Sequence, residues 1–161
     1  MDPMIISLNG WAAGERQYRF QADLEFFQTF DNTEILDADV NVDVLVRKAG
    51  MRKVEADLRL KGTVTVACDR CLERLELPVE ASEVLDAEQE GLLSADGELD
   101  LRQAVYDYVC LALPLQRVHP EGACNPDTIR FLGHQERTDE EAEAEEANSP
   151  FAALKGLFES K

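Results

Sequence analysis

The sequence has little that would place it in or across a membrane. No stretch approaches the roughly 18 apolar residues that a spanning helix needs. The start of the chain has no cationic flank followed by an apolar segment and a cleavage site, so no secretory signal is expected. Basic side chains are also scarce, because 16 Lys and Arg stand against 33 Asp and Glu, a net charge of −17. We therefore expect a soluble, cytoplasmic, acidic protein.

Motifs that carry catalysis are missing too. The chain has no Gly-rich phosphate loop, no Gly-x-Ser-x-Gly elbow and no His-Glu-x-x-His run. Carboxylates are so abundant that some must lie close together by chance, so none is a candidate general acid or base. We expect a protein without enzymatic activity.

The excess of acidic residues extends through the whole chain. Residues 135–161 hold 8 acidic and 3 basic side chains, and the 134 residues before them hold 25 and 13. Affinity for nucleic acid comes largely from Lys and Arg that displace counterions, so autonomous binding to RNA or DNA is disfavoured. The same charge would attract a strongly basic protein.

Alternation of apolar and polar residues predicts three strands, at residues 40–46, 54–66 and 75–81. Gly62 interrupts the second run and predicts a bulge or bend. Strands joined by short turns form an antiparallel meander, and its apolar face must be covered. The chain length of 161 residues fits one domain. We expect an α+β fold in which the meander curls into a barrel-like sheet covered by one main helix.

The covering helix is predicted to begin at Asp100 and to end before Pro114. The carboxylate of Asp100 would cap the first turn while Gln103 reaches back, as in a capping box. One face of this helix is apolar at helical spacing, with Leu101, Ala104, Val105, Tyr108 and Ala112.

The predicted organisation has three parts. Residues 1–134 form a single β-rich domain, residues 135–148 an acidic flexible linker, and residues 149–161 a short amphipathic helix. The apolar stripe of that helix is Phe151, Leu154 and Phe158. So short a helix is marginal alone, so the stripe either docks on the domain or anchors a partner.

Cys68 and Cys71 lie between two predicted strands, at the tip of a hairpin. Two cysteines three residues apart in a tight turn can direct both sulfurs to one Zn²⁺. The better candidates for the other two ligands are His119 and Cys124, in a segment that Pro and Gly allow to bend. Cys110 is instead predicted to be a buried thiol within the helix.

Two other interpretations of the cysteine pair stay open. The turn could be reduced and metal-free, or it could be a redox motif with a lowered thiol pKa. Redox motifs of this kind usually open a helix in an α/β setting, whereas strands flank this one. The remaining histidine, His134, is predicted to lie on the surface.

A stripe of basic residues follows the same hairpin and offers a contact surface. Its members are Arg52, Lys53, Arg59, Lys61, Arg70 and Arg74. The simpler interpretation is a solvated strand face of mixed charge. Arg70 and Arg74, beside the cysteines, are the candidates for partner binding, together with the C-terminal stripe.

Three segments in this order resemble the YceD family of bacterial proteins. They are Cys68-Asp69-Arg70-Cys71-Leu72 after a Gly-x-Val-x-Val strand; Glu98-Leu99-Asp100-Leu101 through Leu111-Ala112-Leu113-Pro114 and Val118-His119 to Cys124; and Asn148-Ser149-Pro150-Phe151-Ala152-Ala153-Leu154. The similarity covers roughly residues 35–158.

The resemblance implies a role in accumulation of large-subunit (23S) ribosomal RNA, hence in ribosome assembly. It also implies association with a small basic large-subunit ribosomal protein, and no enzyme activity is established for the family. Two functions compete: an assembly factor that binds a basic ribosomal protein or a pre-ribosomal particle, and a zinc-containing module that binds rRNA directly through the cysteine hairpin.

Overall fold

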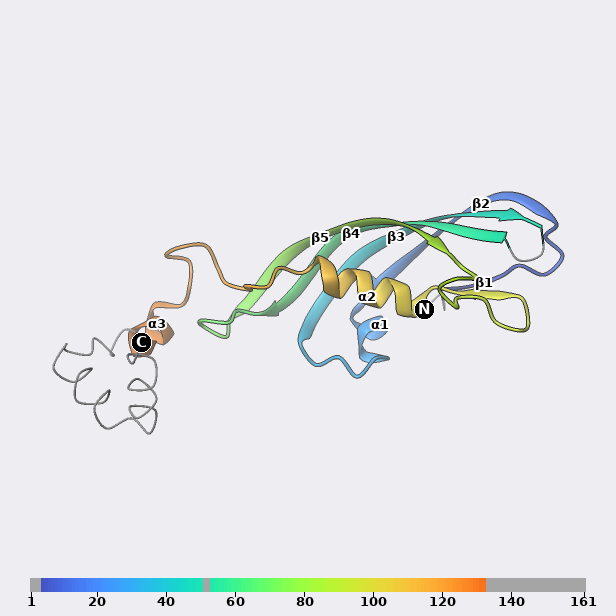
Figure 1. The fold of residues 1–161 in the computed structure, drawn as a ribbon. Coiled ribbons are helices and arrows are strands. Elements are labelled where there is room, and N and C mark those ends of the chain that lie inside the picture. The colour runs from blue at the N-terminus through green and yellow to red at the C-terminus, as the bar shows by residue number, and fades with distance from the viewer. Residues whose placement is uncertain (1–3, 51–52, 133–161) are drawn as a thin grey trace, which may run out of the picture. The chain divides into compact units, whose positions relative to one another are not determined.

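The computed structural model describes residues 4–50 and 53–132, and the residues up to Cys124 form one compact unit. Its main feature is an antiparallel sheet in the order β2-β3-β4-β5 (Figure 1). These strands are β2 (Ala13–Asp23), β3 (Ile35–Ala49), β4 (Lys53–Ala67) and β5 (Arg74–Asp86). The same unit holds a second sheet of β1 (Ile5–Ser7) and β6 (Glu98–Asp100), and the helices α1 (Leu24–Gln28) and α2 (Arg102–Ala112).

The predicted alternation is confirmed in β3, β4 and β5. Val44 and Leu58 are register partners, and both side chains are buried. Their sequence neighbours Asp43 and Arg59 point to the other face, because successive side chains of a strand alternate. That outer face carries charged pairs, including Arg19 with Asp43 at 2.8 Å. The sheet is therefore apolar on one side only, and the α+β prediction is confirmed.

Both helices of this unit lie on the same side of the sheet (Figure 1). α2 contacts β5, and α1 contacts β2 and β3. The predicted lid is confirmed, since Ala104 and Val105 of α2 are buried. The ring of Tyr106 stacks on that of Phe30, with 4.3 Å between ring centroids, which joins α2 to the loop after α1.

Contrary to our prediction of a barrel-like sheet, the sheet does not close into a barrel. β2 and β5 pair with one inner neighbour each, and no pairing joins the two within the described part of the chain. Strand β2 was itself not predicted. Its inward positions include the exposed Arg16 and the half-buried Tyr18 and Phe20, so the alternation there is weak.

The predicted bulge at Gly62 is wrong. The register runs unbroken through this residue, which pairs with Val40 and Val79, and the irregularity lies instead between Ile35 and Asp37. The glycine is required by close approach, because a Cβ at this position would collide with the backbone carbonyl of Asp39.

The predicted capping box is also wrong. α2 begins at Arg102, its N-cap is Leu101, and no side chain caps it. The Asp100 carboxylate accepts a bond from the Arg102 backbone N–H at 3.0 Å and binds its guanidinium, which lowers the pKa of Asp100. Gln103 donates to Asp107 one turn later instead of reaching back.

Several predictions lie outside the described residues, namely the acidic linker, the C-terminal helix and His134. The boundary at residue 134 stays a prediction. The helix α3 (Pro126–Leu132) belongs to a second unit that begins at Asn125. Within the described residues, no helix combines the length and apolarity that crossing a bilayer requires.

Replacing Val44 or Leu58 with Asp places a carboxylate without a partner in the core. We expect a loss of about 3–5 kcal/mol in the free energy of unfolding, measured by urea denaturation. Asn41→Asp, at an exposed position of β3, is the matched control and leaves stability nearly unchanged. Parent-like unfolding of both core variants would show that the register is misassigned.

Candidate metal centre

The tip of the β4–β5 hairpin buries two thiols. Cys68 donates its backbone N–H to the carbonyl of Glu73 at 2.8 Å, which continues the strand register by one more pair. The N–H of Leu72 then returns to the carbonyl of Cys68 at 2.9 Å and closes the turn. Cys68 and Cys71 consequently point inward, at 0% and 4% exposure.

The segment that follows α2 is fastened to this tip by two reciprocal bonds. The Asp69 N–H donates to the carbonyl of Arg117 at 2.8 Å, and the Arg117 N–H donates to the Asp69 carboxylate at 2.9 Å. His119 and Cys124 follow in the same segment. The hairpin and this segment therefore meet at one point although about 50 residues separate them in sequence.

Cys68, Cys71, His119 and Cys124 place their ligand atoms within 4.8 Å of one another. The His119 Nδ1 lies 3.4 Å from the Cys71 sulfur and 3.8 Å from that of Cys124, and the sulfurs of Cys68 and Cys124 are 3.9 Å apart. Tetrahedral zinc with Zn–S of about 2.3 Å and Zn–N of about 2.0 Å puts neighbouring ligand atoms about 3.5–3.8 Å apart. The spacing fits a Cys₃His set around one ion.

The imidazole of His119 is oriented for ligation. Its Nε2 lies 3.2 Å from the backbone carbonyl of Arg74, which can only accept. In the neutral ring, Nε2 therefore carries the proton, and Nδ1 presents its lone pair to the sulfurs. A backbone carbonyl that fixes the ring in this way is a common feature of metal-bound histidines.

The surroundings of Cys68 favour its thiolate. Burial opposes ionisation of this sulfur, but hydrogen bonds from the backbone at Cys71, Arg70 and His119 outweigh it, and the pKa falls to about 6. The hydrogen bond to Cys68 also raises the pKa of His119, and burial raises that of Cys124. A thiolate near neutral pH is the form that binds a metal ion.

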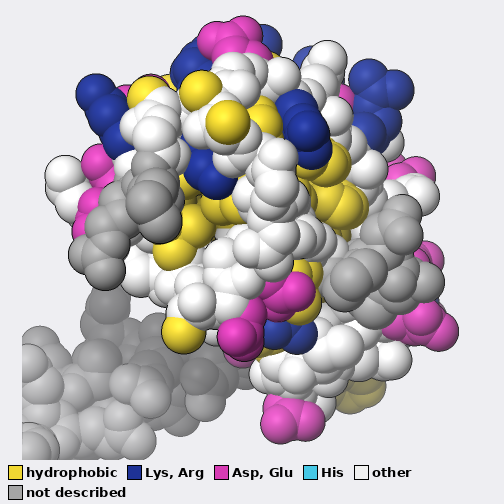
Figure 2. Space-filling model, turned by 90° about the vertical axis from the view of Figure 1, so that its right-hand side faces the viewer, with side chains coloured by type: hydrophobic (Ala, Val, Ile, Leu, Met, Phe, Trp, Pro, Cys, Tyr) yellow, Lys and Arg dark blue, Asp and Glu magenta, His cyan; other side chains and the backbone are white. Residues whose placement is uncertain are grey.

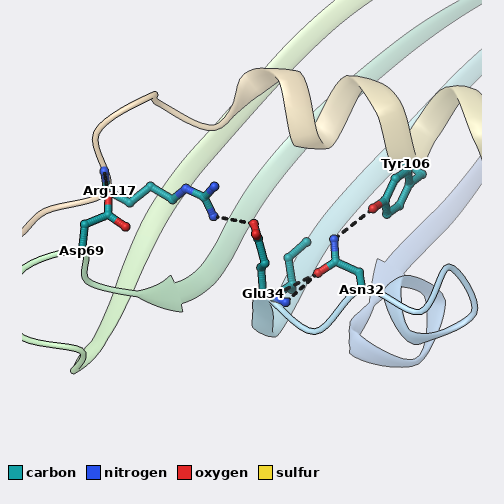
Figure 3. Close-up of polar contacts among 6 residues, drawn as sticks. Asn32, Glu34, Asp69, Tyr106 and Arg117 are labelled. Atoms are coloured by element: carbon teal, nitrogen blue, oxygen red, sulfur yellow. Dashed lines mark hydrogen bonds and ion pairs between the residues drawn. The ribbon is translucent and has the colours of Figure 1, made fainter.

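A polar network supports the site from the side of the sheet (Figure 3). The guanidinium of Arg117 donates to the Glu34 carboxylate at 3.0 Å. The Asn32 amide donates to the Tyr106 hydroxyl at 3.0 Å, and its oxygen accepts the backbone N–H of Glu34 at 2.9 Å. The network connects the segment after α2, α2 itself and the loop before β3. Sequence reasoning missed these residues, because polar contacts so distant in sequence leave no local pattern.

The other sequence-predicted site residues contribute no side chain to the cluster. Cys110 is half-buried on α2, and burial raises its pKa, as expected of a packed thiol. Arg70 is exposed at the hairpin tip, and Arg74 pairs with Asp37 at 3.4 Å. Arg52 and the stripe of Phe151, Leu154 and Phe158 lie outside the described residues.

A hollow of about 620 Å³ lies at the opposite end of the sheet, near the start of β4. Figure 2 views this end and shows hydrophobic side chains at its centre with charged side chains around them. The described residues that line the hollow include no set of metal ligands. Its lining is Leu8, Asn9, Lys48, Glu88, Leu93, Ser94, Ala95 and Gly97.

The fold and the cluster define a small α+β protein with a candidate structural metal centre at the tip of a hairpin. Residues 56–158, more than half of the chain, match the family described as Large ribosomal RNA subunit accumulation protein YceD. The chain therefore belongs to the YceD family. No curated protein and no solved structure matches the chain.

Proposed function

We propose that the protein is a non-enzymatic ribosome assembly factor of the cytoplasm that supports accumulation of large-subunit (23S) rRNA. It acts by binding a basic large-subunit ribosomal protein or a pre-ribosomal particle. The family description supports the pathway, and the net charge of −17 supports a basic partner. An acidic protein can screen the charge of a basic ribosomal protein until that protein reaches RNA.

One observation favours binding of a basic protein over direct binding of RNA: cations of the basic stripe are paired with carboxylates. Arg59 lies 3.4 Å from Asp57, and Lys61 lies 3.5 Å from Glu80. Arg74 likewise contacts an acidic side chain. A phosphate backbone would have to compete with these carboxylates for the three cations, and the surrounding negative charge would repel it.

The alternative is a zinc-containing module that binds rRNA through the cysteine hairpin. Arg70 and Arg74 would make its phosphate contacts, since they flank the buried thiols.

In the leading proposal, the C-terminal stripe of Phe151, Leu154 and Phe158 anchors the partner. Its acidic linker would then act as a tether.

We further propose that Cys68, Cys71, His119 and Cys124 hold one Zn²⁺ in a structural site. Three sulfurs and one imidazole nitrogen fill all four positions of a tetrahedral ion, so no position is left for substrate or water. Such an ion would fasten the segment after α2 to the hairpin and add to the folding free energy. A role in holding shape fits a binding protein better than a catalyst.

Cys68→Ser should lower both the zinc content and the melting temperature, because it removes one ligand and leaves the others in an incomplete site. Metal content is measured by elemental analysis of protein purified without chelator, and stability by calorimetry. Cys110→Ala is the control and should retain the parent's zinc content. A full equivalent of zinc in a Cys68→Ser, Cys71→Ser double variant would refute the assignment.

The partner is tested with proteins extracted from purified large ribosomal subunits and freed of RNA by nuclease. We expect the immobilised chain to retain one basic protein at about 0.15 M salt and to release it near 1 M, since screening weakens charge attraction. A parallel column receives deproteinised large-subunit rRNA. Retention of the rRNA without any retained protein would favour the RNA-binding alternative.

A further inference from the structure

Strand β5 is an edge strand, and its hydrogen-bond register decides which backbone groups face outward. Glu73 accepts a bond from Cys68, and the Ala87 N–H donates to the carbonyl of Val54. Glu73 and Ala87, both odd-numbered, thus direct these backbone groups toward β4 and its continuation at Cys68. The register between these two points is continuous, so every odd-numbered residue of β5 faces β4. The even-numbered residues direct their N–H and C=O groups to the open edge.

The open edge runs from Glu76 to Val84. Next to the hairpin tip, the carbonyl of Arg74 accepts a hydrogen bond from His119. This bond agrees with the outward direction assigned to even-numbered residues. At the other end, the carbonyl of Asp86 accepts the Glu90 N–H at 3.0 Å. Between Glu76 and Val84, no described residue hydrogen-bonds to the outward backbone groups of β5. The even-numbered residues Glu76, Pro78, Glu80, Ser82 and Val84 are all exposed.

The stretch around Ser82 is open on both faces of the strand. Ser82, Glu83 and Val84 are exposed in succession, which in a strand means that neither face is covered there. Val84 exposes 61% of its surface to solvent. An added strand would find backbone partners and an apolar side chain at the same place.

The charge along this edge has one sign. Between Glu76 and Val84 its charged residues are Glu76, Glu80 and Glu83, and Glu80 contacts Lys61 of β4 at 3.5 Å. The other edge strand, β2, carries Arg16 and Arg19 and is mixed in charge. Charge therefore favours a basic segment as the partner of β5, because opposite charges on paired strands attract and like charges are destabilising.

We propose that a basic protein segment in extended conformation binds along the β5 edge between Glu76 and Val84 and adds a fifth strand to the sheet. Main-chain hydrogen bonds give the affinity, as in other strand-addition complexes, and the acidic side chains select Lys and Arg in the segment. This inference rests on the proposed function, to which it adds the binding surface and the form of the partner.

Two other interpretations of this edge, self-association and protection from aggregation, have less support. A second copy of the chain would bring the same acidic strand against itself, and charge repulsion opposes that pairing. Pro78 and the glutamates also protect the edge from aggregation. That protection is local, because Pro78 removes one outward N–H and leaves those of Glu80, Ser82 and Val84.

Ser82→Pro tests the backbone contact, with Ser82→Ala as the matched control. Proline removes the outward N–H of residue 82, whereas alanine keeps it. Pro78 occupies an outward position of the same kind, so the variant should fold, and its melting temperature is compared with the control. The probe is a synthetic decapeptide of alternating Lys and Thr. We expect Ser82→Pro to bind it about tenfold more weakly than Ser82→Ala.

The second measurement needs no variant. The amide protons of Glu80, Ser82 and Val84 should become protected from exchange when the peptide binds the full chain, as followed by NMR. Those of Val79 and Leu85, already bonded to β4, should change little. Equal peptide affinity of the two Ser82 variants, or absence of protection at the three outward amides, would overturn the proposal, as would protection that arises through self-association without peptide.

The same variants separate this proposal from the proposed function. If the parent chain retains a basic ribosomal protein and Ser82→Pro retains it equally well, the function stands and the β5 edge is not its surface. If the parent retains no ribosomal protein but the peptide protects the edge amides, strand addition stands and the assigned partner is wrong.

Discussion

The antiparallel register between β4 and β5 is the constraint on which the rest of the structure depends. It buries alternate side chains such as Leu58 and Val79 in the core. It carries the hairpin to a tip where Cys68 and Cys71 point inward. It also directs alternate backbone groups of β5 to the open edge. A shift of one residue would exchange the two faces and disperse both the candidate metal centre and the candidate docking strand.

The sequence was sufficient to predict the elements in which a periodic apolar pattern coincides with burial. Val44 on β3 and Val105 on α2 are such positions, and both are buried. Strand β2 escaped prediction because Ala22 is its one buried residue, and exposed Arg16 and half-buried Tyr18 break its apolar pattern. Closure of the sheet was predicted wrongly. Alternation of apolar and polar residues indicates which face of a strand is buried, but it does not indicate which strands pair.

The candidate site was accessible from the sequence for a chemical reason. Few residue types bind zinc, and their spacing in a turn and in a bendable segment narrowed the choice to Cys68, Cys71, His119 and Cys124, which the structure brings together. The supporting contacts were not accessible. The pairing of Asp69 with Arg117 depends on how two distant segments cross, which local composition does not encode.

The four candidate ligands at the hairpin tip come from two distant segments, so a bound ion would hold both segments in place. The central claim is therefore that four ligands from two distant segments surround one zinc ion. X-ray absorption at the zinc edge tests this most directly. The account predicts three sulfur neighbours at about 2.3 Å and one nitrogen at about 2.0 Å. A shell of four sulfurs, or one of only oxygen and nitrogen, would contradict it.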